Sequence, residues 1–376
     1  MSETINVKAY GAAGDGITDD SRAINKALEK GGEIYIPAGE YLLGENLVIG
    51  SHTHITADKA AHLFRKAHTQ ITRKDYLLTN ADPVNGNEDI ALSGGVWDGN
   101  CYPEDRGNDL FAPESTTGVM LNFRKVKGLT LRDMVLRDAL CYYTRFCEAE
   151  DVEIERIRFA SERIVPNQDG IHLAGYCRNF RIRDLYGEAG SPNDDFLALN
   201  ADDASQRQEC FDSVNGPIEN ITAENIHSEL CHCFVRLLSV QSDIRNVTIR
   251  NVTGKCKYNA FNMDAARNCR VPLFKESDYP NGVGNIENVK IEKVSVSNEN
   301  AGEALFRIET NLKGFRVADF ENRDGEKCLF ARVKNTAAFH FTYETAEGTR
   351  SENAAANAEV PFYAEKVGSF AFDVKE

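Results

Sequence analysis

Apolar residues recur in a fixed pattern through the middle of the chain. In six stretches they occupy the third, fifth and eighth places, and polar or charged residues fill most of the places between them. The stretches begin at Lys127, Glu150, Arg178, Glu219, Arg245 and Glu287. Within each stretch the alternation has a period of two residues and breaks after the fifth place. This pattern predicts a β-strand that ends at a bend, where a second strand begins.

The spacing of the six stretches identifies a repeat. Their starts lie 23, 28, 41, 26 and 42 residues apart, which indicates a period near 25 with insertions in two coils. The core columns favour Val and Ile over Leu and Ala, which argues against leucine-rich and helical repeats. A parallel β-solenoid is therefore expected, in which stacked coils bury one another's inner faces. The two aligned columns are Leu129, Val152, Phe180, Ile221, Val247 and Val289, and Leu131, Ile154, Ile182, Ala223, Ile249 and Ile291.

The N-terminal segment carries a different signal. Asp19, Asp20 and Ser21 precede an amphipathic segment at residues 22–30, which ends at two glycines. This arrangement predicts an N-capped helix followed by a strand at 33–37. Because the first coil of a solenoid has no preceding neighbour, we expect this helix to cover the open end.

The repeat is lost beyond about residue 325. Apolar segments at 337–343 and 368–373 predict extra strands that pack on the far end of the solenoid, and the polar stretch 347–357 between them predicts a loop. The expected organisation is a β-helix domain with its N-terminal cap at residues 1–325, followed by C-terminal strands at 326–376.

Several asparagines lie next to the core columns. Asn220, Asn246 and Asn251 each precede a residue and a threonine in the pattern of a glycosylation acceptor. Glycosylation would require a secreted protein. The alternative, which the repeat favours, is that polar residues at the bends bond the backbone of neighbouring coils.

The net charge of −15 restricts the partners. Nucleic acids and anionic membranes both attract basic surfaces, so neither is expected to bind this chain. A strongly anionic polymer is a less favourable substrate on average, although a local basic groove could override the average. The sequence contains no apolar run long enough for a membrane-spanning helix. Assembly of the chain into homo-oligomers is left open.

Ten cysteines are scattered without regular spacing, which is typical of reduced, buried thiols. The residues after Met1 lead directly into structured-looking sequence without a signal peptide. Both features predict a cytoplasmic protein, although removal of a signal peptide would give the same pattern. Cys231 and Cys233 flank His232, but their spacing is not that of a zinc site. No metal or cofactor is expected.

Three aspartates form the main candidate for chemistry. Asp169 opens one short apolar run, and Asp194 and Asp195 open the next, 25 residues later. Since neighbouring coils lie about 4.8 Å apart, residues one period apart are expected to come together. Three carboxyl groups on one face suit acid/base cleavage of a glycosidic bond. A solvated turn and a set of calcium ligands are the alternatives.

These motifs resemble those of the pectin-lyase-like superfamily of right-handed parallel β-helices. The opening at residues 7–20 and the Gly-Gly-Val-Trp-Asp-Gly-Asn motif at 94–100 resemble segments of such proteins. Within the superfamily the chain is most similar to family 28 glycoside hydrolases, the polygalacturonase-type enzymes. The resemblance spans about residues 5–325. It implies an all-β fold, a right-handed parallel β-helix (solenoid) with an N-terminal capping helix and extra C-terminal strands.

The family pattern is Asn-x-Asp-Gly, Asp-Asp, Gly-His-Gly and Arg-x-Lys on four successive coils. Asn167 and Asp169 match the first element, Asp194 and Asp195 the second, and His232 keeps the histidine of the third without its glycines. At the fourth place the chain reads Ala-Phe-Asn-Met-Asp at residues 260–264, so the Arg-x-Lys pair is absent. The family uses that pair to hold the carboxylate of the sugar. Either galacturonate is not the substrate or its recognition falls to another arginine; the candidates are Arg145, Arg207, Arg236 and Arg267.

The resemblance implies a role for each matching residue. Asp194 is the expected acid, Asp169 and Asp195 share the role of base, and His232 tunes the acid or bonds the sugar. Inverting hydrolysis would place the carboxyl groups about 6.5–9.5 Å apart. The candidate substrate-binding residues are Asn167, His172, Arg145, Arg236, Asn262 and Asp264. Alternation along a strand places His172 on the opposite face from Asp169 if no bulge intervenes.

The expected function is inverting hydrolysis of oligosaccharides, including pectin-derived ones that contain uronates. A polysaccharide lyase or uronate epimerase on the same fold is the first alternative; both use a Lys or Arg base and often calcium. A non-catalytic carbohydrate-binding β-helix, such as a phage-fibre or adhesion module, is the second. The co-occurrence of three aspartates with His232 favours the hydrolase.

Overall fold

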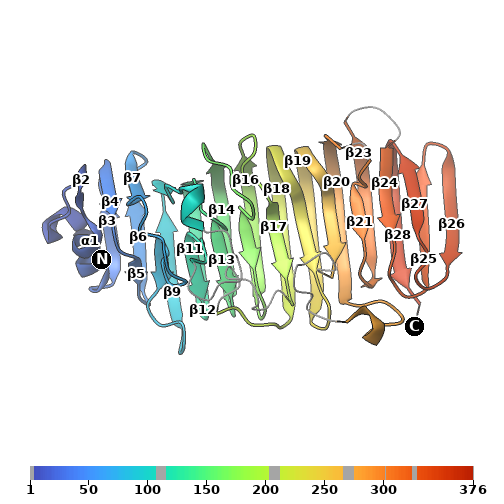
Figure 1. The fold of residues 1–376 in the computed structure, drawn as a ribbon, viewed down its shortest axis with the longest axis horizontal. Coiled ribbons are helices and arrows are strands. Elements are labelled where there is room, and N and C mark those ends of the chain that lie inside the picture. The colour runs from blue at the N-terminus through green and yellow to red at the C-terminus, as the bar shows by residue number, and fades with distance from the viewer. Residues whose placement is uncertain are drawn as a thin grey trace.

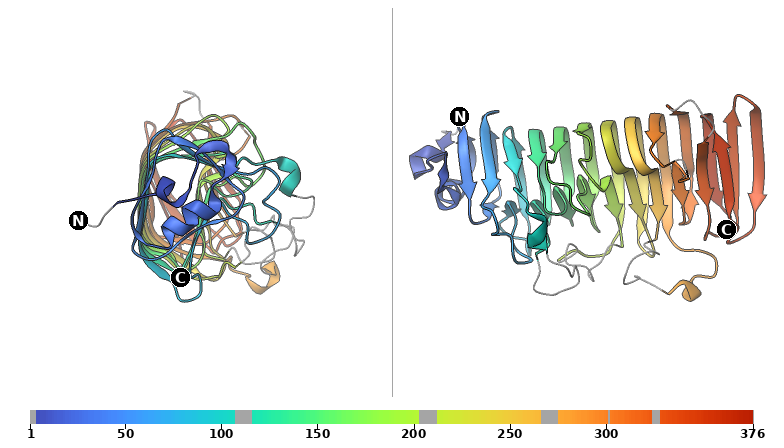
Figure 2. Two further views of the ribbon diagram at one scale, coloured as in Figure 1. Left: turned by 90° about the vertical axis from the view of Figure 1, so that its left-hand side faces the viewer. Right: turned by 45° about the horizontal axis from the view of Figure 1, so that its top comes forward.

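The protein is an elongated stack of coils with its termini at opposite ends (Figure 1). The computed structural model describes residues 4–106, 116–202, 212–265, 275–300, 302–323 and 328–375. The end-on view in Figure 2 shows successive coils lying over one another around a common core. The architecture is the expected right-handed parallel β-helix. None of the helices in the described ranges is long and apolar enough to span a membrane.

The strands form three parallel stacks that run the length of the molecule. The first begins with β1 (Ile5–Asn6), β3 (Gly32–Ile36), β6 (Thr53–Ala57) and β9 (Asn87–Ser93). The second begins with β2 (Asp15–Asp19), β4 (Gly39–Leu43), β7 (Ala61–Arg65) and β10 (Val96–Asp98). Bent strands then continue both stacks: β12 (Val126–Arg137), β14 (Glu150–Ala160), β16 (Arg178–Gly187), β18 (Ile218–Leu238), β19 (Asp243–Asp264), β20 (Asn285–Asn298) and β23 (Phe315–Asn322).

The third stack carries the candidate chemistry. It contains β5 (Leu47–Ile49), β8 (Leu78–Asn80), β11 (Leu121–Arg124), β13 (Thr144–Cys147), β15 (Ile171–Leu173) and β17 (Asp195–Asn200), then the ends of β18 and β19, and finally β21 (Phe306–Ile308) and β24 (Cys328–Val333). Other short elements in the described ranges are β22 (Leu312–Lys313) and the 3₁₀ turns η1 (Val7–Tyr10), η2 (Pro103–Arg106) and η4 (Glu276–Asp278).

The strand register confirms the alignment of the repeats. The first residues of the six stretches pair with one another in order, from Lys127 with Glu150 to Arg245 with Glu287. Every residue of the two core columns is at most 1% exposed. The spacing of apolar residues in the sequence was therefore sufficient to place these strands side by side.

The bends fall at the second and seventh places of the repeat, where the backbone adopts positive φ. The second place is the site of an asparagine ladder: Asn220 donates to Asn179 at 3.0 Å, and Asn246 donates to Asn220 at 3.0 Å. At the seventh place Asn251 donates to Asn225 at 2.8 Å. The prediction that these residues join neighbouring coils at the bends is confirmed, but the prediction that they bond the backbone is wrong for these bonds. Their partners are other side chains, because identical residues stack directly above one another.

A short helix covers the N-terminal end, as expected (Figure 2). The helix α1 spans Ser21–Leu28, and Ile24 and Ala27 are buried against the first coils. Asp20 occupies the N-cap position, but its side chain makes no capping bond. Instead its carboxylate accepts the backbone N–H groups of Ala13 and Gly14, at 2.6 and 2.9 Å. The cap geometry predicted from the sequence is wrong here because a loop with free N–H groups lies beside Asp20.

The C-terminal strands reverse direction and close the opposite end. They are β25 (Phe339–Thr345), β26 (Gly348–Ala354), β27 (Val360–Ala364) and β28 (Lys366–Val374). Antiparallel pairing joins β28 to β23 and β27 to β24. The stretch predicted as a loop at 347–357 contains β26, an exposed edge strand, so its polarity reflects solvent exposure rather than a turn. Strands on both sides of residue 325 share one hydrophobic core, and the division into two domains at that residue stays a prediction.

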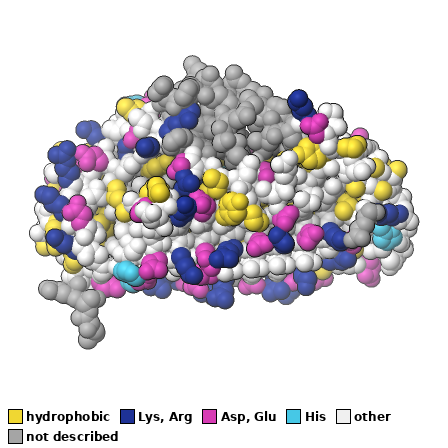
Figure 3. Space-filling view, turned by 90° about the horizontal axis from the view of Figure 1, so that it is seen from below, with side chains coloured by type: hydrophobic (Ala, Val, Ile, Leu, Met, Phe, Trp, Pro, Cys, Tyr) yellow, Lys and Arg dark blue, Asp and Glu magenta, His cyan; other side chains and the backbone are white. Residues whose placement is uncertain are grey.

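Basic and acidic side chains are interspersed on the face of the molecule seen in Figure 3. Many pair between neighbouring coils: Arg250 contacts Glu224 at 3.0 Å and Glu292 at 2.8 Å, and Arg156 contacts Asp133 at 2.6 Å. Exposed pairs of this kind contribute little stability each. They do allow the outer faces of parallel coils to carry charge without repulsion between neighbours.

Candidate active site

The third stack brings the three predicted aspartates together. Ile171 of β15 pairs with Leu197 of β17, so Asp169 lies level with Asp195 on the next coil. One carboxylate oxygen from each of Asp169, Asp194 and Asp195 lies within 4.8 Å of the others. Side-chain exposure is 5% for Asp169, 23% for Asp194 and 7% for Asp195. Asp194 is therefore the carboxyl group most open to a ligand.

The spacing of these oxygens differs from the expected one. A separation of about 6.5–9.5 Å would suit an inverting hydrolase, whereas the nearest oxygens here approach within 4.8 Å. The reason is that two of the aspartates are adjacent in sequence and the third lies on the directly stacked coil. The same three oxygens form the one group of ligand atoms in the described ranges that could hold a cation.

Crowding and burial change the protonation of the cluster. Burial raises the pKa of Asp195 well above its ordinary value of 3.8, and the charges of Asp194 and Asp169 raise it further. Arg236 and His232 oppose these effects without cancelling them. Three carboxyl groups in contact cannot all ionise at low cost, so the cluster retains a proton to a higher pH than an isolated aspartate would.

Two predicted residues hold Asp194. His232 approaches it through Nδ1, 3.0 Å from Oδ1, and Asn167 donates to Oδ2 at 3.4 Å. The pKa of His232 is raised; burial lowers it, but the hydrogen bond and charge of Asp194 outweigh burial. The rings of Tyr258 and His232 meet edge to face, with 4.5 Å between the ring centroids.

A residue that the sequence did not indicate fixes this arrangement. Arg106, at the end of η2, donates to Oδ1 of Asn167 at 2.8 Å and also bonds the carbonyl of Pro166. Arg106 lies about sixty residues earlier in the chain, outside the core repeat. No local spacing links it to the aspartates, so only the folded chain reveals its position.

The prediction that the side chain of His172 faces away from Asp169 is wrong. Its Nδ1 lies 2.7 Å from Oδ2 of Asp169, and its ring stacks on Tyr142 with 3.9 Å between the centroids. Alternation placed the two residues on opposite faces, but Asp169 lies in the turn before β15, where alternation does not apply. Because His172 is buried, it positions Asp169 and does not line the groove.

A groove of about 350 Å³ lies beside the cluster. The residues that line it are Asp194, Asp195, His232, Cys233, Arg236, Tyr258, Asn259, Asn262, Glu303 and Arg307. Arg236 makes a two-point ion pair with Asp264, with Nε 3.1 Å from Oδ1 and Nη2 3.3 Å from Oδ2. The structure thus brings Arg236, Asn262 and Asp264 to the site. Asp264 lies behind the groove, and Glu303 and Arg307 were not predicted because they follow the aligned motifs.

Arg145 lies away from this groove. It is buried on β13, where it donates to Asn122 at 2.9 Å and to Tyr76 at 3.4 Å. The other two candidate arginines, Arg207 and Arg267, fall outside the described residues.

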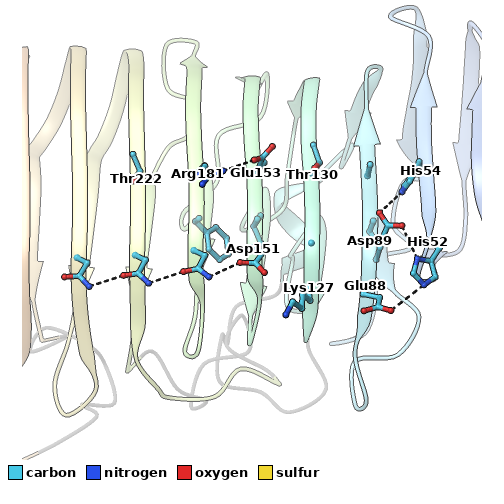
Figure 4. A pocket seen from close by; sticks show the side chains of 18 residues that line it. His52, His54, Glu88, Asp89, Lys127, Thr130, Asp151, Glu153, Arg181 and Thr222 are labelled. Atoms are coloured by element: carbon cyan, nitrogen blue, oxygen red, sulfur yellow. Dashed lines mark hydrogen bonds and ion pairs between the residues drawn. The ribbon is translucent and has the colours of Figure 1, made fainter.

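A larger cleft of about 1130 Å³ lies on the first stack (Figure 4). Polar and apolar residues both line it, and Figure 4 shows the ladder that begins at Asp151 crossing it. His52 and His54 both approach the carboxylate of Asp89, at 3.0 and 2.9 Å. Its acids are thus engaged with histidines, with Arg181 or with the ladder. Among the described residues, no carboxyl cluster comparable with that of the third stack is found there. This cleft is the larger of the two, but the groove beside the three aspartates is the better candidate for an active site because it holds the carboxyl cluster.

Comparisons with known proteins agree with this fold. A family described as "Rhamnogalacturonase A/epimerase, pectate lyase-like" matches residues 4–99. Rhamnogalacturonase A of Aspergillus niger is 26% identical over 261 residues, which cover 67% of this chain and 50% of that protein. The crystal structure of an exopolygalacturonase from Thermotoga maritima superimposes with a TM-score of 0.60 at 17% identity and covers 96% of both chains.

A different kind of relative matches a shorter segment. The pre-neck appendage protein of Bacillus phage phi29 is 38% identical over 96 residues, which make up 26% of this chain and 11% of that protein. The chain therefore spans only a small part of this relative. Taken together, the comparisons confirm the resemblance to pectate-lyase-like β-helix proteins, with polygalacturonase- and rhamnogalacturonase-type enzymes among the relatives.

Proposed function

We propose that this chain is a glycoside hydrolase that cleaves oligosaccharides by acid/base catalysis. The observation that carries the proposal is the contact between Asp169, Asp194 and Asp195 at the edge of a groove, with oxygens within 4.8 Å. Such a cluster holds a proton and negative charge together, and hydrolysis of a glycosidic bond needs an acid and a base at the same time.

Exposure supports the assignment of Asp194 as the acid. It is the most exposed of the three and lines the groove, so it can reach the oxygen of the leaving sugar. Asp169 and Asp195 lie deeper, where together they would orient the attacking water, and the ionised member of the two would accept its proton. His232 and Asn167 fix the Asp194 carboxyl group through the bonds described above.

Two other functions have support. The phage appendage relative favours a carbohydrate-binding β-helix without catalysis. A lyase or epimerase would need a basic residue at the acids, and Arg236 does lie 3.9 Å from Asp195. That guanidinium group, however, is held by Asp264, so it is not available as the base that such an enzyme needs.

The first test compares wild type with Asp194→Asn on a panel of pectic and neutral oligosaccharides. New reducing ends should appear with wild type, without the ultraviolet absorbance of an unsaturated product. Asp194→Asn should slow their release by about 10²–10⁴-fold, the usual contribution of a positioned acid. NMR spectra recorded during the reaction show which anomer of the product forms first, and this distinguishes inversion from retention.

Asp133→Asn is a matched control, because Asp133 pairs with Arg156 on the outer surface. It should cleave the panel at the wild-type rate. Absorbance growth would replace the hydrolase with a lyase. Binding without any cleavage would favour the non-catalytic alternative.

A further inference from the structure

We infer that the sugar unit bound in the groove beside the three aspartates is uncharged, so that the substrate is a neutral glycan rather than a uronate or a sulfated sugar. The inference rests on the proposed function and names its substrate class. It follows from how the arginines and carboxylates of the groove are paired.

Arg236 is committed to a carboxylate of the protein. Its two-point pair with Asp264 is largely shielded, with side-chain exposures of 18% and 12%. A second acid, Asp195, lies 3.9 Å away. To bind the carboxylate of a uronate, Arg236 would have to turn from Asp264 and leave a shielded charge without its partner. Breaking such a pair is strongly unfavourable.

Arg307 is also paired with an acid of the protein, through its Nε. Its Nε lies 2.7 Å from Oε1 of Glu309, whose side chain is only 3% exposed. Lys334 approaches the same oxygen at 3.2 Å. Glu309 is thus a buried acid that is paired with both cations. Moving either cation to a ligand would leave the buried carboxylate with less compensating charge, which is unfavourable.

Apart from His232, which is paired with Asp194, the remaining charged groups of the groove are acids. Asp194, Asp195 and Glu303 line it, and Asp264 and Glu309 lie behind its arginines. A uronate carboxylate would enter among like charges, which disfavours its ionised form. The arginines of the groove are paired with acids, whereas Lys257, a nearby described cation, is not. Its Nζ donates to the amide oxygen of Asn193 at 2.9 Å.

The neutral polar groups of the groove suit hydroxyl groups. Asn262 lines it, and its Oδ1 is buried without a hydrogen-bond donor among the described residues. Buried polar atoms are normally satisfied, and a sugar hydroxyl is a donor of the required kind. Tyr258, 45% exposed beside His232, offers a ring face for the apolar side of a sugar.

The experiment uses pairs of oligosaccharides that differ only in charge: a uronate oligomer and the same oligomer after reduction of its carboxyl groups. Wild type should cleave the reduced, neutral member with the higher kcat/KM. Binding of both members to Asp194→Asn, measured by calorimetry, should show the same order. Asp264→Asn releases Arg236 and should shift the ratio of uronate to neutral binding by about 10-fold toward the uronate, the effect of one charge-assisted hydrogen bond.

Controls separate the outcomes. Asp133→Asn removes a carboxylate from a surface arginine and should leave the ratio unchanged, as should Lys257→Gln. Preference for the uronate by wild type, or a ratio that depends on Lys257, overturns the inference even if hydrolysis is confirmed. If no sugar is cleaved, the hydrolase proposal fails, and the binding order still decides the charge of the ligand. Binding of neither member overturns both.

Discussion

At the scale of single residues, the ionised form of Asp195 in the candidate active site lowers the stability of the folded protein. Burial and the neighbouring charges of Asp194 and Asp169 raise its pKa above the value in an unfolded chain. Folding therefore favours the protonated form. The protonated carboxyl group of Asp195 therefore contributes fully to the stability of the folded protein below the ordinary pKa of 3.8. This contribution is lost as the pH rises through the raised pKa of the folded protein.

We predict that Asp195→Asn stabilises the protein at neutral pH while it abolishes hydrolysis. The amide keeps the shape of the side chain and removes the buried charge. The melting temperature should rise by on the order of 2 °C near pH 7, and the gain should vanish near pH 4, where the wild-type carboxyl group is protonated. Calorimetry at both pH values measures it. A loss of stability at neutral pH would show that the charge of Asp195 is compensated.

At the scale of elements, histidines join the first coils. His62 of β7 lies 2.6 Å from Glu40 of β4 and 3.0 Å from Asp98 of β10. His54 of β6 makes the equivalent bridge between Glu33 and Asp89. In each case hydrogen bonds to the carboxylates raise the pKa of the ring, against the effect of burial. Each charged histidine therefore holds three successive coils together.

The direction of the pKa shift of His62 predicts how the stability of His62→Gln depends on pH. The raised pKa means that the bridge contributes fully below the unfolded pKa of 6.5 and is lost as the pH rises through the folded value. The melting temperature of the variant should fall below that of wild type more at about pH 5.5 than at about pH 8.5. His340→Gln is the control, because its ring contacts Asn353 and Ser351 instead of acids. An equal loss at both pH values would mean that His62 acts through packing.

The asparagine ladder permits a second test at this scale. Asn220 combines positive φ with ladder bonds to Asn179 and Asn246. Asn220→Ala loses both and should destabilise by about 2 kcal/mol, from left-handed strain and lost hydrogen bonds. Asn220→Gly keeps the backbone conformation and should lose less. Thermal unfolding of the two variants compares the contributions; an equal loss would assign the whole effect to the ladder bonds.

At the scale of the whole molecule, the two ends of the solenoid differ. The helix α1 covers the first coil, whereas β27 and β28 cover β24 and β23 by antiparallel pairing. Uncovered strand edges invite association between molecules. The antiparallel strands thus end the repeat and also protect its last parallel strands.

We predict that a chain ending at Val333 aggregates. Removal of β25–β28 exposes the edges of β23 and β24, and it also uncovers Phe330, which packs on Phe370 of the removed β28. Light scattering after size-exclusion chromatography should show large species at concentrations where the full chain is dispersed. Removal of only the last two residues is the control. A monodisperse truncated chain with the wild-type melting temperature would show that the parallel coils need no cover.

The sequence by itself determined the solenoid, the register of its repeats and the meeting of three aspartates. Those features follow from periodicity, because identical spacing must stack identical positions. Only the tertiary structure decided which side chains meet between coils. The contact of His172 with Asp169, the support of Asn167 by Arg106 and the pairing of Arg236 with Asp264 depend on turns and loops. The paths of those segments are set by packing against distant residues, which a local pattern does not encode.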